Sequence, residues 1–256
     1  MRNLTASFLL AIGCIVMVSG CSNSQGDEHF TEQVENKSPE GLYQDARTAM
    51  ELGNFTKATQ ILETLDSRYP FGAHKTQVQL DLIFSYYKLE DSANALANID
   101  RFVRLNPTHK DIDYVYYMRG LTNMQSDEYM FHEMVGIDRS DRDPSAAMEA
   151  FRDFEKLLKT FPNSRYSPDA QQRMIMLKNR LARFHLQVAE YYVSVDTWVA
   201  AANRAQQIME TFGDTPSAER ALEIMVISYE KLKQDTLMAN AKNVLATNFP
   251  DNRYAQ

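Results

Sequence analysis

Small and apolar residues recur along this chain at a fixed distance from a proline or glycine. The residues that close the units are Pro70, Pro107, Pro162, Gly213 and Pro250. Twelve residues before each of them lie Ala58, Ala95, Ala150, Ala201 and Met238. Most residues four and seven positions after these are apolar, and positions 0, 4 and 7 share one face of an α-helix. The pattern predicts a series of helices that each bury one face and stop at a proline or glycine.

A second recurring position predicts a partner for the repeated helix. Tyr86, Tyr192 and Tyr229 lie nine residues before the small position, and Ala49 takes that place in the first unit. The arrangement resembles the tetratricopeptide repeat, in which a small residue lets the two helices of a hairpin approach closely and a proline ends the second. The sequence therefore predicts an all-α fold, a right-handed superhelix of about five tetratricopeptide-like helical hairpins.

Two of the units are longer than the others. Their closing residues are 37, 55, 51 and 37 residues apart. In the third unit we expect a first helix from residue 111 to about 124, a long loop, and a second helix opened by Asp143 as N-cap and Pro144 in its first turn. In the fourth unit residues 169 to about 193 contain no helix breaker, which predicts one long helix. The fifth unit departs most from the pattern, as terminal repeats often do.

The first residues have the features of an export signal. Arg2 supplies a positive charge, and Phe8 through Val18 form an apolar run that is too short to span a bilayer permanently. The run ends in Val18-Ser19-Gly20-Cys21, which resembles the lipobox of bacterial lipoproteins. We therefore predict a signal peptide over residues 1–20 and, on Cys21 of the mature protein, covalent diacylglycerol and N-acyl lipid as the membrane anchor.

An ordinary secreted protein, cut after a small residue and carrying Cys21 as a stray thiol, is the alternative. The polar linker that follows Cys21 at once favours the lipoprotein. Cys14 would be removed with the signal, so the mature chain has one cysteine and no disulfide. Ser22 stands where lipoproteins retained at the inner membrane tend to carry Asp, which favours the outer membrane.

The mature chain begins with a polar segment and carries a net negative charge. Residues 21–38 carry four acids against one lysine and only two sizeable apolar groups, Phe30 and Val34, so we expect a flexible tether. Loss of Arg2 with the signal leaves 26 basic and 34 acidic residues, a formal charge of −8. A body this acidic is a poor ligand for nucleic acid or anionic lipid, so the lipid alone should attach it to the membrane.

No pattern of catalytic or metal-binding residues emerges. The histidines at positions 29, 74, 109, 132 and 185 lack ligand spacing, and glycine is too sparse for a phosphate or dinucleotide loop. Residues 138–143, DRSDRD, alternate aspartates with arginines and lack the glycine and distant Glu of a calcium loop, so internal ion pairing is the better interpretation. These absences predict a binding scaffold without metal or cofactor, and not an enzyme.

Three arginines fall outside the packing pattern. Arg101 and Arg104 lie one turn apart, roughly opposite the face that Ala95, Ile99 and Phe102 would bury. Arg204 follows Ala201 by three residues. They are either binding residues or solvated surface groups paired with nearby acids.

Several ungapped strings resemble the BamD (ComL/YfiO) family of outer-membrane assembly lipoproteins. They are RYPFG at 68–72, VQLDLIFSYYK at 78–88, IDRFVRLNPTH at 99–109, IDYVYYMRGLTNM at 112–124, DRSDRDP at 138–144 and PNSRY at 162–166. The resemblance runs from about residue 39 to at least residue 230. It implies a scaffold at the periplasmic face of the outer membrane that assists assembly and insertion of β-barrel proteins. A different periplasmic repeat scaffold, serving envelope growth or division, is the alternative.

The resemblance also assigns roles to parts of the chain. It implies that repeats 1–2 (39–110) receive the targeting strands of unfolded β-barrel proteins, that repeat 3 (111–168) carries the inserted loop, and that repeats 4–5 (169–256) bind the periplasmic domains of BamA, beside other lipoproteins of the complex. The substrate-binding residues carried over are Tyr69, Gly72, Arg101 and Arg104, and the partner-binding residue is Arg204. Thr56 departs from the family, which has a basic residue there.

Overall fold

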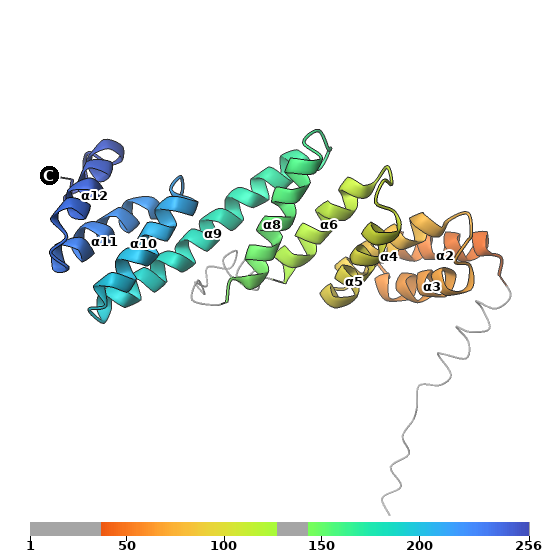
Figure 1. Ribbon diagram of the computed structural model, residues 1–256. Coiled ribbons are helices and arrows are strands. Elements are labelled where there is room, and N and C mark those ends of the chain that lie inside the picture. The colour runs from red at the N-terminus through yellow and green to blue at the C-terminus, as the bar shows by residue number, and fades with distance from the viewer. Residues whose placement is uncertain (1–36, 127–142, 256) are drawn as a thin grey trace, which may run out of the picture. The chain divides into compact units, whose positions relative to one another are not determined.

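The computed structural model describes residues 37–126 and 143–255, which form ten α-helices and no strand (Figure 1). The helices are α2 (Pro39–Glu51), α3 (Phe55–Arg68), α4 (Lys75–Lys88), α5 (Ser92–Leu105), α6 (Ile112–Gln125), α8 (Ser145–Thr160), α9 (Ser167–Ser194), α10 (Trp198–Phe212), α11 (Ser217–Lys231) and α12 (Asp235–Asn248). They belong to one compact unit, Pro39–Gln256. The predicted signal peptide, Cys21, nearly all of the tether and the DRSDR stretch at 138–142 lie outside the described residues.

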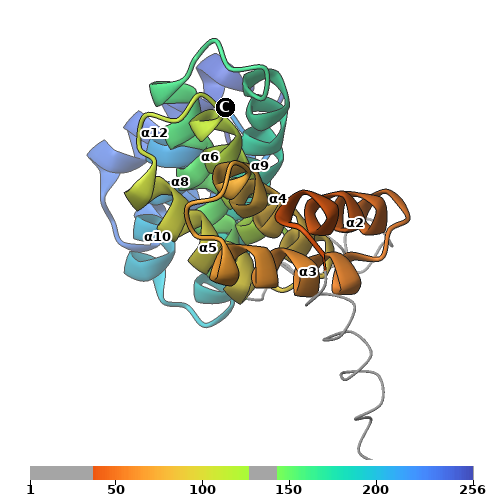
Figure 2. The same ribbon diagram turned by 90° about the vertical axis from the view of Figure 1, so that its right-hand side faces the viewer.

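Consecutive helices pair into hairpins, and each hairpin packs on the next. The pairs are α2 with α3, α4 with α5, α6 with α8, α9 with α10, and α11 with α12. The second helix of each hairpin also contacts the first helix of the following one, as α3 contacts α4. Both views show α2 and α3 side by side (Figures 1 and 2). The prediction of an all-α array of tetratricopeptide-like hairpins is confirmed.

The small residues of the repeat pattern lie at the helix contacts, as predicted. Ala58, Ala95, Ala150 and Ala201 are all fully buried, and the apolar residues four and seven positions later are buried with them. The last hairpin follows the pattern less closely, because Met238 and Lys242 are only half-buried. Each hairpin therefore buries one face of its second helix against its partner, and only stacking on a neighbour completes the core.

The prolines end the second helices as expected. Tyr69, Asn106, Phe161 and Phe249 each precede a proline, and the N–H of each donates to the carbonyl four residues earlier, at 2.7–2.9 Å. The following proline has no N–H with which to continue the ladder. At the other end, the side chains of Asn54 and Asp91 accept hydrogen bonds from the backbone N–H three residues on and cap α3 and α5.

The start of α8 differs from the prediction by one residue. The helix begins at Ser145, so Pro144 is its N-cap and makes no capping bond. Asp143 acts from outside the helix: its Oδ1 accepts from the Ser145 N–H at 3.0 Å and from the Ser145 hydroxyl at 2.6 Å. A proline side chain has no acceptor, which is why the preceding carboxylate takes over this role.

The longest helix, α9, contacts three other helices. It has 28 residues, which confirms the predicted uninterrupted helix, and it packs against α8, α10 and also α11. No helix within residues 37–126 and 143–255 is both long and apolar enough to cross a membrane.

Candidate functional site

The five recognition residues named from the sequence fall into two groups. Tyr69 and Gly72 lie in the turn between α3 and α4, and Arg101 and Arg104 lie on α5 of the next hairpin. Arg204 lies on α10, in the fourth hairpin. The array therefore holds the predicted substrate residues and the predicted partner residue on separate repeats.

Gly72 allows a close backbone approach in the turn after α3. Its N–H donates to the Tyr69 carbonyl at 2.9 Å. A Cβ at Gly72 would lie 3.2 Å from that carbonyl oxygen and 3.4 Å from the Tyr69 Cβ. Its φ is not positive, so glycine serves here for space and not for backbone conformation. Phe71, which lies between Tyr69 and Gly72 in the chain, has 92% of its surface exposed. The Lys75 ammonium lies 5.5 Å from the centre of the Phe71 ring.

A small cavity of about 80 Å³ lies beneath this turn. Tyr69 and Gly72 form part of its wall, together with Pro39 at the start of α2, and Leu65 and Asp66 on α3. Neither Arg101 nor Arg104 lines it. The cavity is too small for a peptide, so it offers room for one side chain of a bound segment.

The two arginines of α5 have different surroundings. Arg101 Nη1 donates to Asp66 Oδ2 at 2.5 Å, which ties α5 to α3, and Gln79 donates to the other oxygen of Asp66 at 3.4 Å. Arg101 therefore reaches the Tyr69 cavity only through Asp66. Arg104 is exposed and pairs with no acid among the described residues. Of the two, Arg104 has the cation that is available to a ligand.

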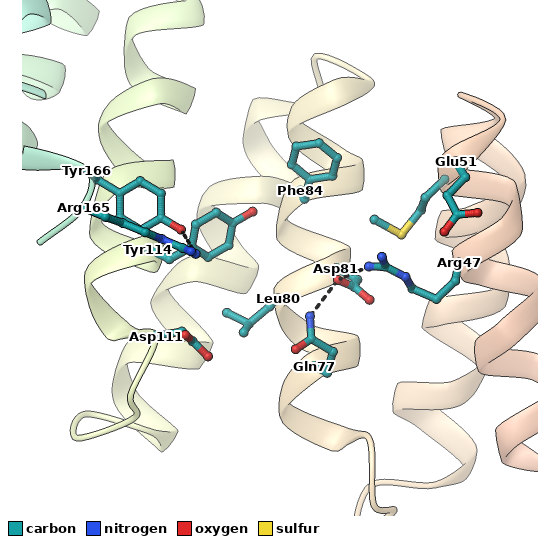
Figure 3. A pocket seen from close by; sticks show the side chains of 11 residues that line it. Arg47, Glu51, Gln77, Leu80, Asp81, Phe84, Asp111, Tyr114, Arg165 and Tyr166 are labelled. Carbon is teal, nitrogen blue, oxygen red and sulfur yellow. Dashed lines mark hydrogen bonds and ion pairs between the residues drawn. The ribbon is translucent and has the colours of Figure 1, made fainter. Parts of the chain in front are cut away.

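A larger groove of about 440 Å³ was not predicted from the sequence. Figure 3 shows its two walls, with Arg47, Glu51, Gln77 and Asp81 on one side, from α2 and α4, and Tyr114, Arg165 and Tyr166 on the other. The sequence signal that could have found it is the pair Gln77 and Asp81, two polar residues one turn apart that alternate with the apolar residues Val78, Leu80 and Leu82.

Asp81 is the buried charge of this groove. Only 5% of its surface is exposed; it accepts from the Tyr43 hydroxyl and from Gln77 Nε2, both at 3.0 Å, and its Oδ1 lies 3.6 Å from Arg47 Nη1. Burial raises the pKa of Asp81, and these hydrogen bonds and the Arg47 charge oppose that shift. Burial and the neighbouring Asp81 also raise the pKa of Tyr43 to about 12.

The opposite wall combines an arginine with aromatic rings. Arg165 Nη2 donates to the Tyr166 hydroxyl at 2.5 Å, and the guanidinium lies 4.8 Å from the centre of that ring. Burial raises the pKa of Tyr114. The groove therefore offers aromatic surface beside an arginine bound to a tyrosine hydroxyl, a combination suited to extended peptide with aromatic side chains.

Arg204 contacts two neutral groups. Its Nη1 lies 3.0 Å from His185 Nδ1 on α9 and 3.2 Å from Gln207 Oε1 on its own helix. The sequence left open a solvated group paired with nearby acids; no acid among the described residues pairs with Arg204, which contacts these neutral groups instead. Nothing in the local pattern marked His185, which lies 19 residues earlier.

Residues 37–126 and 143–255 contain no group of three or more His, Cys, Asp or Glu placed to hold a metal ion. What these residues do form is a stack of helical hairpins with a peptide-sized groove and exposed cations. Such arrays define a class of scaffold proteins that bind other proteins.

Comparison with known proteins identifies the family within this class. The family model described as YfiO, outer membrane lipoprotein, matches residues 35–245. The chain belongs to the YfiO family of outer membrane lipoproteins, which confirms the resemblance found in the sequence.

Individual relatives are similar over nearly the whole chain. The outer membrane protein assembly factor BamD of Vibrio cholerae is 46% identical over 97% of this chain and 99% of its own length. The protein of the same name from Neisseria meningitidis serogroup B is 38% identical over 94% of this chain and 91% of its own. Among solved structures, a thermophilic tetratricopeptide protein of Thermus thermophilus aligns over 85% of this chain and 97% of its own, with 16% identity and a TM-score of 0.38. The fold assignment rests on the helices described above and not on that alignment.

Proposed function

We propose that this protein is a lipid-anchored scaffold of the β-barrel assembly machinery at the periplasmic face of the outer membrane. It assists the insertion of β-barrel proteins by holding BamA and receiving the targeting strands of unfolded substrates. The observation that carries the proposal is the identity with proteins named as this assembly factor, which extends over nearly the full length of both chains. The scaffold acts without catalysis or a cofactor, and lipid on Cys21 attaches it to the membrane.

The N-terminal repeats are the substrate side in this proposal. An extended strand presents unpaired backbone groups and alternating side chains, which need aromatic surface, room for close backbone approach and nearby cations. The turn with Tyr69, Phe71 and Gly72 supplies the first two, and Arg104 supplies an exposed cation that no acid of residues 37–126 and 143–255 neutralises. The groove between α2, α4 and α6 extends this surface with Arg165 and the Tyr114 and Tyr166 rings.

Photocrosslinking in living cells tests the substrate side. A photoreactive residue at position 69 or 71 should form adducts with newly exported β-barrel proteins. Position 237 on α12 is the matched control, because Leu237 is also an exposed apolar residue, with 45% of its surface accessible, and should give no such adduct. Adducts only with cell-wall enzymes would support the alternative, a scaffold for envelope growth or division.

The C-terminal repeats are the BamA side, with Arg204 as a contact residue. Arg204→Glu should reduce the amount of BamA that co-purifies with the protein while the helical circular dichroism stays unchanged. Arg152→Glu on α8 is the control, since Arg152 is exposed and already paired with Glu149 on its own helix, so its reversal should leave BamA binding intact. Equal BamA recovery with Arg204→Glu and wild type would contradict this assignment.

A further inference from the structure

Arg204 differs in its partners from three arginines that bind acids on other helices. Arg101, Arg119 and Arg220 each place a guanidinium nitrogen within 3.0 Å of a carboxylate oxygen on another helix. Arg204 has instead a histidine ring nitrogen and an amide oxygen, and both contacts use Nη1. The donors on Nη2 and Nε make no contact with the described residues, and the positive charge is not neutralised locally.

His185 is fixed by its surroundings on α9. Only 7% of its surface is exposed. Its ring stacks on Phe212 of α10, with centroids 5.6 Å apart and an angle of 26° between planes, and lies edge-on to Phe184 at 5.6 Å. A ring held between two aromatic groups cannot turn freely, so the direction of its Nδ1 lone pair is set by packing.

The charge state of His185 follows from the same surroundings. Burial lowers its pKa from the ordinary 6.5, and the positive charge of Arg204 lowers it further. Arg204 on α10 is the charged group that acts on the ring; no charged group on α8 or α11, the other helices packed against α9, contributes within the described residues. The ring is therefore neutral at neutral pH, and acceptance by Nδ1 requires that its proton sit on Nε2.

We propose that His185 is a positioning residue for partner binding. Its Nδ1 lone pair accepts a hydrogen bond from Nη1 of Arg204, and this contact orients the guanidinium so that Nη2 and Nε can bind a carboxylate of the partner. A neutral acceptor fits this task better than an acid, because an acid would neutralise the arginine within the protein and reduce its attraction for the partner. The inference rests on the proposed function, in which Arg204 contacts BamA.

Two substitutions at position 185 separate positioning from packing. His185→Phe keeps an aromatic ring against Phe212 but has no acceptor. His185→Asn places a carbonyl oxygen where Nδ1 was, and that oxygen accepts at every pH. Affinity for full-length BamA would be measured with the lipidated full-length protein in detergent, by surface-immobilised binding, at pH 7.5 and over a series of decreasing pH values. Arg204→Ala is the reference variant, and thermal unfolding monitors the fold.

At pH 7.5 we expect His185→Phe to weaken BamA binding about tenfold, the lower end of the loss typical of one hydrogen bond to a charged group, and His185→Asn to bind nearly as wild type. As the pH falls through the lowered pKa of His185, wild type should weaken relative to His185→Asn, because protonation of the ring removes the lone pair and places a second cation beside Arg204. A purely structural role would not produce a pH dependence that Asn abolishes. If His185→Phe unfolds at a lower temperature than wild type, its BamA affinity is set aside, and the pH dependence of wild type compared with His185→Asn tests the positioning role.

Two other outcomes are distinguishable. If Arg204→Ala weakens BamA binding while His185→Phe binds normally, or wild type and His185→Asn still share one pH profile after the His185 ring has become protonated, the positioning role is wrong and the proposed partner site stands. If Arg204→Ala itself leaves binding unchanged, the proposed partner contact is wrong, and the role of His185 fails with it.

Discussion

Gly120 determines how closely α6 approaches α8 in the third hairpin. Phe154 on α8 is fully buried, and a Cβ built on Gly120 would lie 2.5 Å from its Cε1 and 2.7 Å from its Cδ1 and Cζ. Carbon atoms in good contact lie about 3.5–4.0 Å apart, so Gly120→Ala must displace the ring or the helix. The substitution tests whether this glycine is required for space.

The expected cost is the difference of two opposing terms. Overpacking a buried site costs about 1–3 kcal/mol. Alanine is favoured over glycine in a helix by about 0.5–1 kcal/mol, which offsets part of that cost. Because three ring atoms would fall well inside contact distance, we expect Gly120→Ala to lower the free energy of unfolding by about 1–2 kcal/mol.

Urea unfolding followed by circular dichroism at 222 nm measures this change. A second background provides the control: Phe154→Leu replaces the ring by a shorter side chain, so Gly120→Ala should cost less in that variant than in wild type. If Gly120→Ala is as stable as the parent protein, or costs the same in both backgrounds, the close approach of α6 to Phe154 is not what requires glycine.

Three further predictions concern charge and attachment. Burial raises the pKa of Asp81 in the folded protein, so the folded state binds a proton more readily than the unfolded chain. The stability of wild type relative to Asp81→Asn should therefore rise as the pH falls from 7 through the raised pKa toward the ordinary value of 3.8. Thermal melts measure this, and a stability difference that does not change with pH would contradict the prediction. Arg101→Ala should lower the free energy of unfolding by about 1 kcal/mol, because it leaves the mostly buried Asp66 without its cation. Arg104→Ala, which breaks no ion pair, is its control, and equal effects in urea titrations would refute the distinction. Cys21→Ser should release a folded protein into the periplasm, and recovery of an unfolded protein from that fraction would show that the anchor is needed for folding.

The repeat pattern could be predicted because it depends on short-range relations. A helix face requires apolar residues four and seven positions apart, and a proline ends a helix through its own missing N–H, so both signals lie within a few residues of their effect. Ala58 and the other small residues were placed correctly in the core for this reason. The start of α8 was one residue off because Asp143 and Pro144 are both compatible with a helix start, and only the realised backbone selects between them.

The candidate sites were only partly accessible from the sequence. Tyr69 and Gly72 lie three residues apart in the RYPFG string, on either side of the proline predicted to end the helix. Arg101 and Arg104 look alike in sequence, yet Arg101 is bound to Asp66, 35 residues earlier, whereas Arg104 pairs with no acid in the part of the chain that the structure describes. The residues that line the groove of Asp81 and Arg165 come from separate hairpins. The periodicity within one hairpin does not predict which residues of another hairpin lie beside it.

The sequence by itself determined that this chain is an array of helical hairpins of the YfiO family, because local spacing specifies each hairpin and long shared strings identify the relatives. Only the tertiary structure decided which charges are neutralised and which remain available, because that depends on the residues that stacking brings together. Arg204 illustrates the difference. Its position in the chain indicated an exposed cation, but its orientation is set by His185, 19 residues away on the long helix α9.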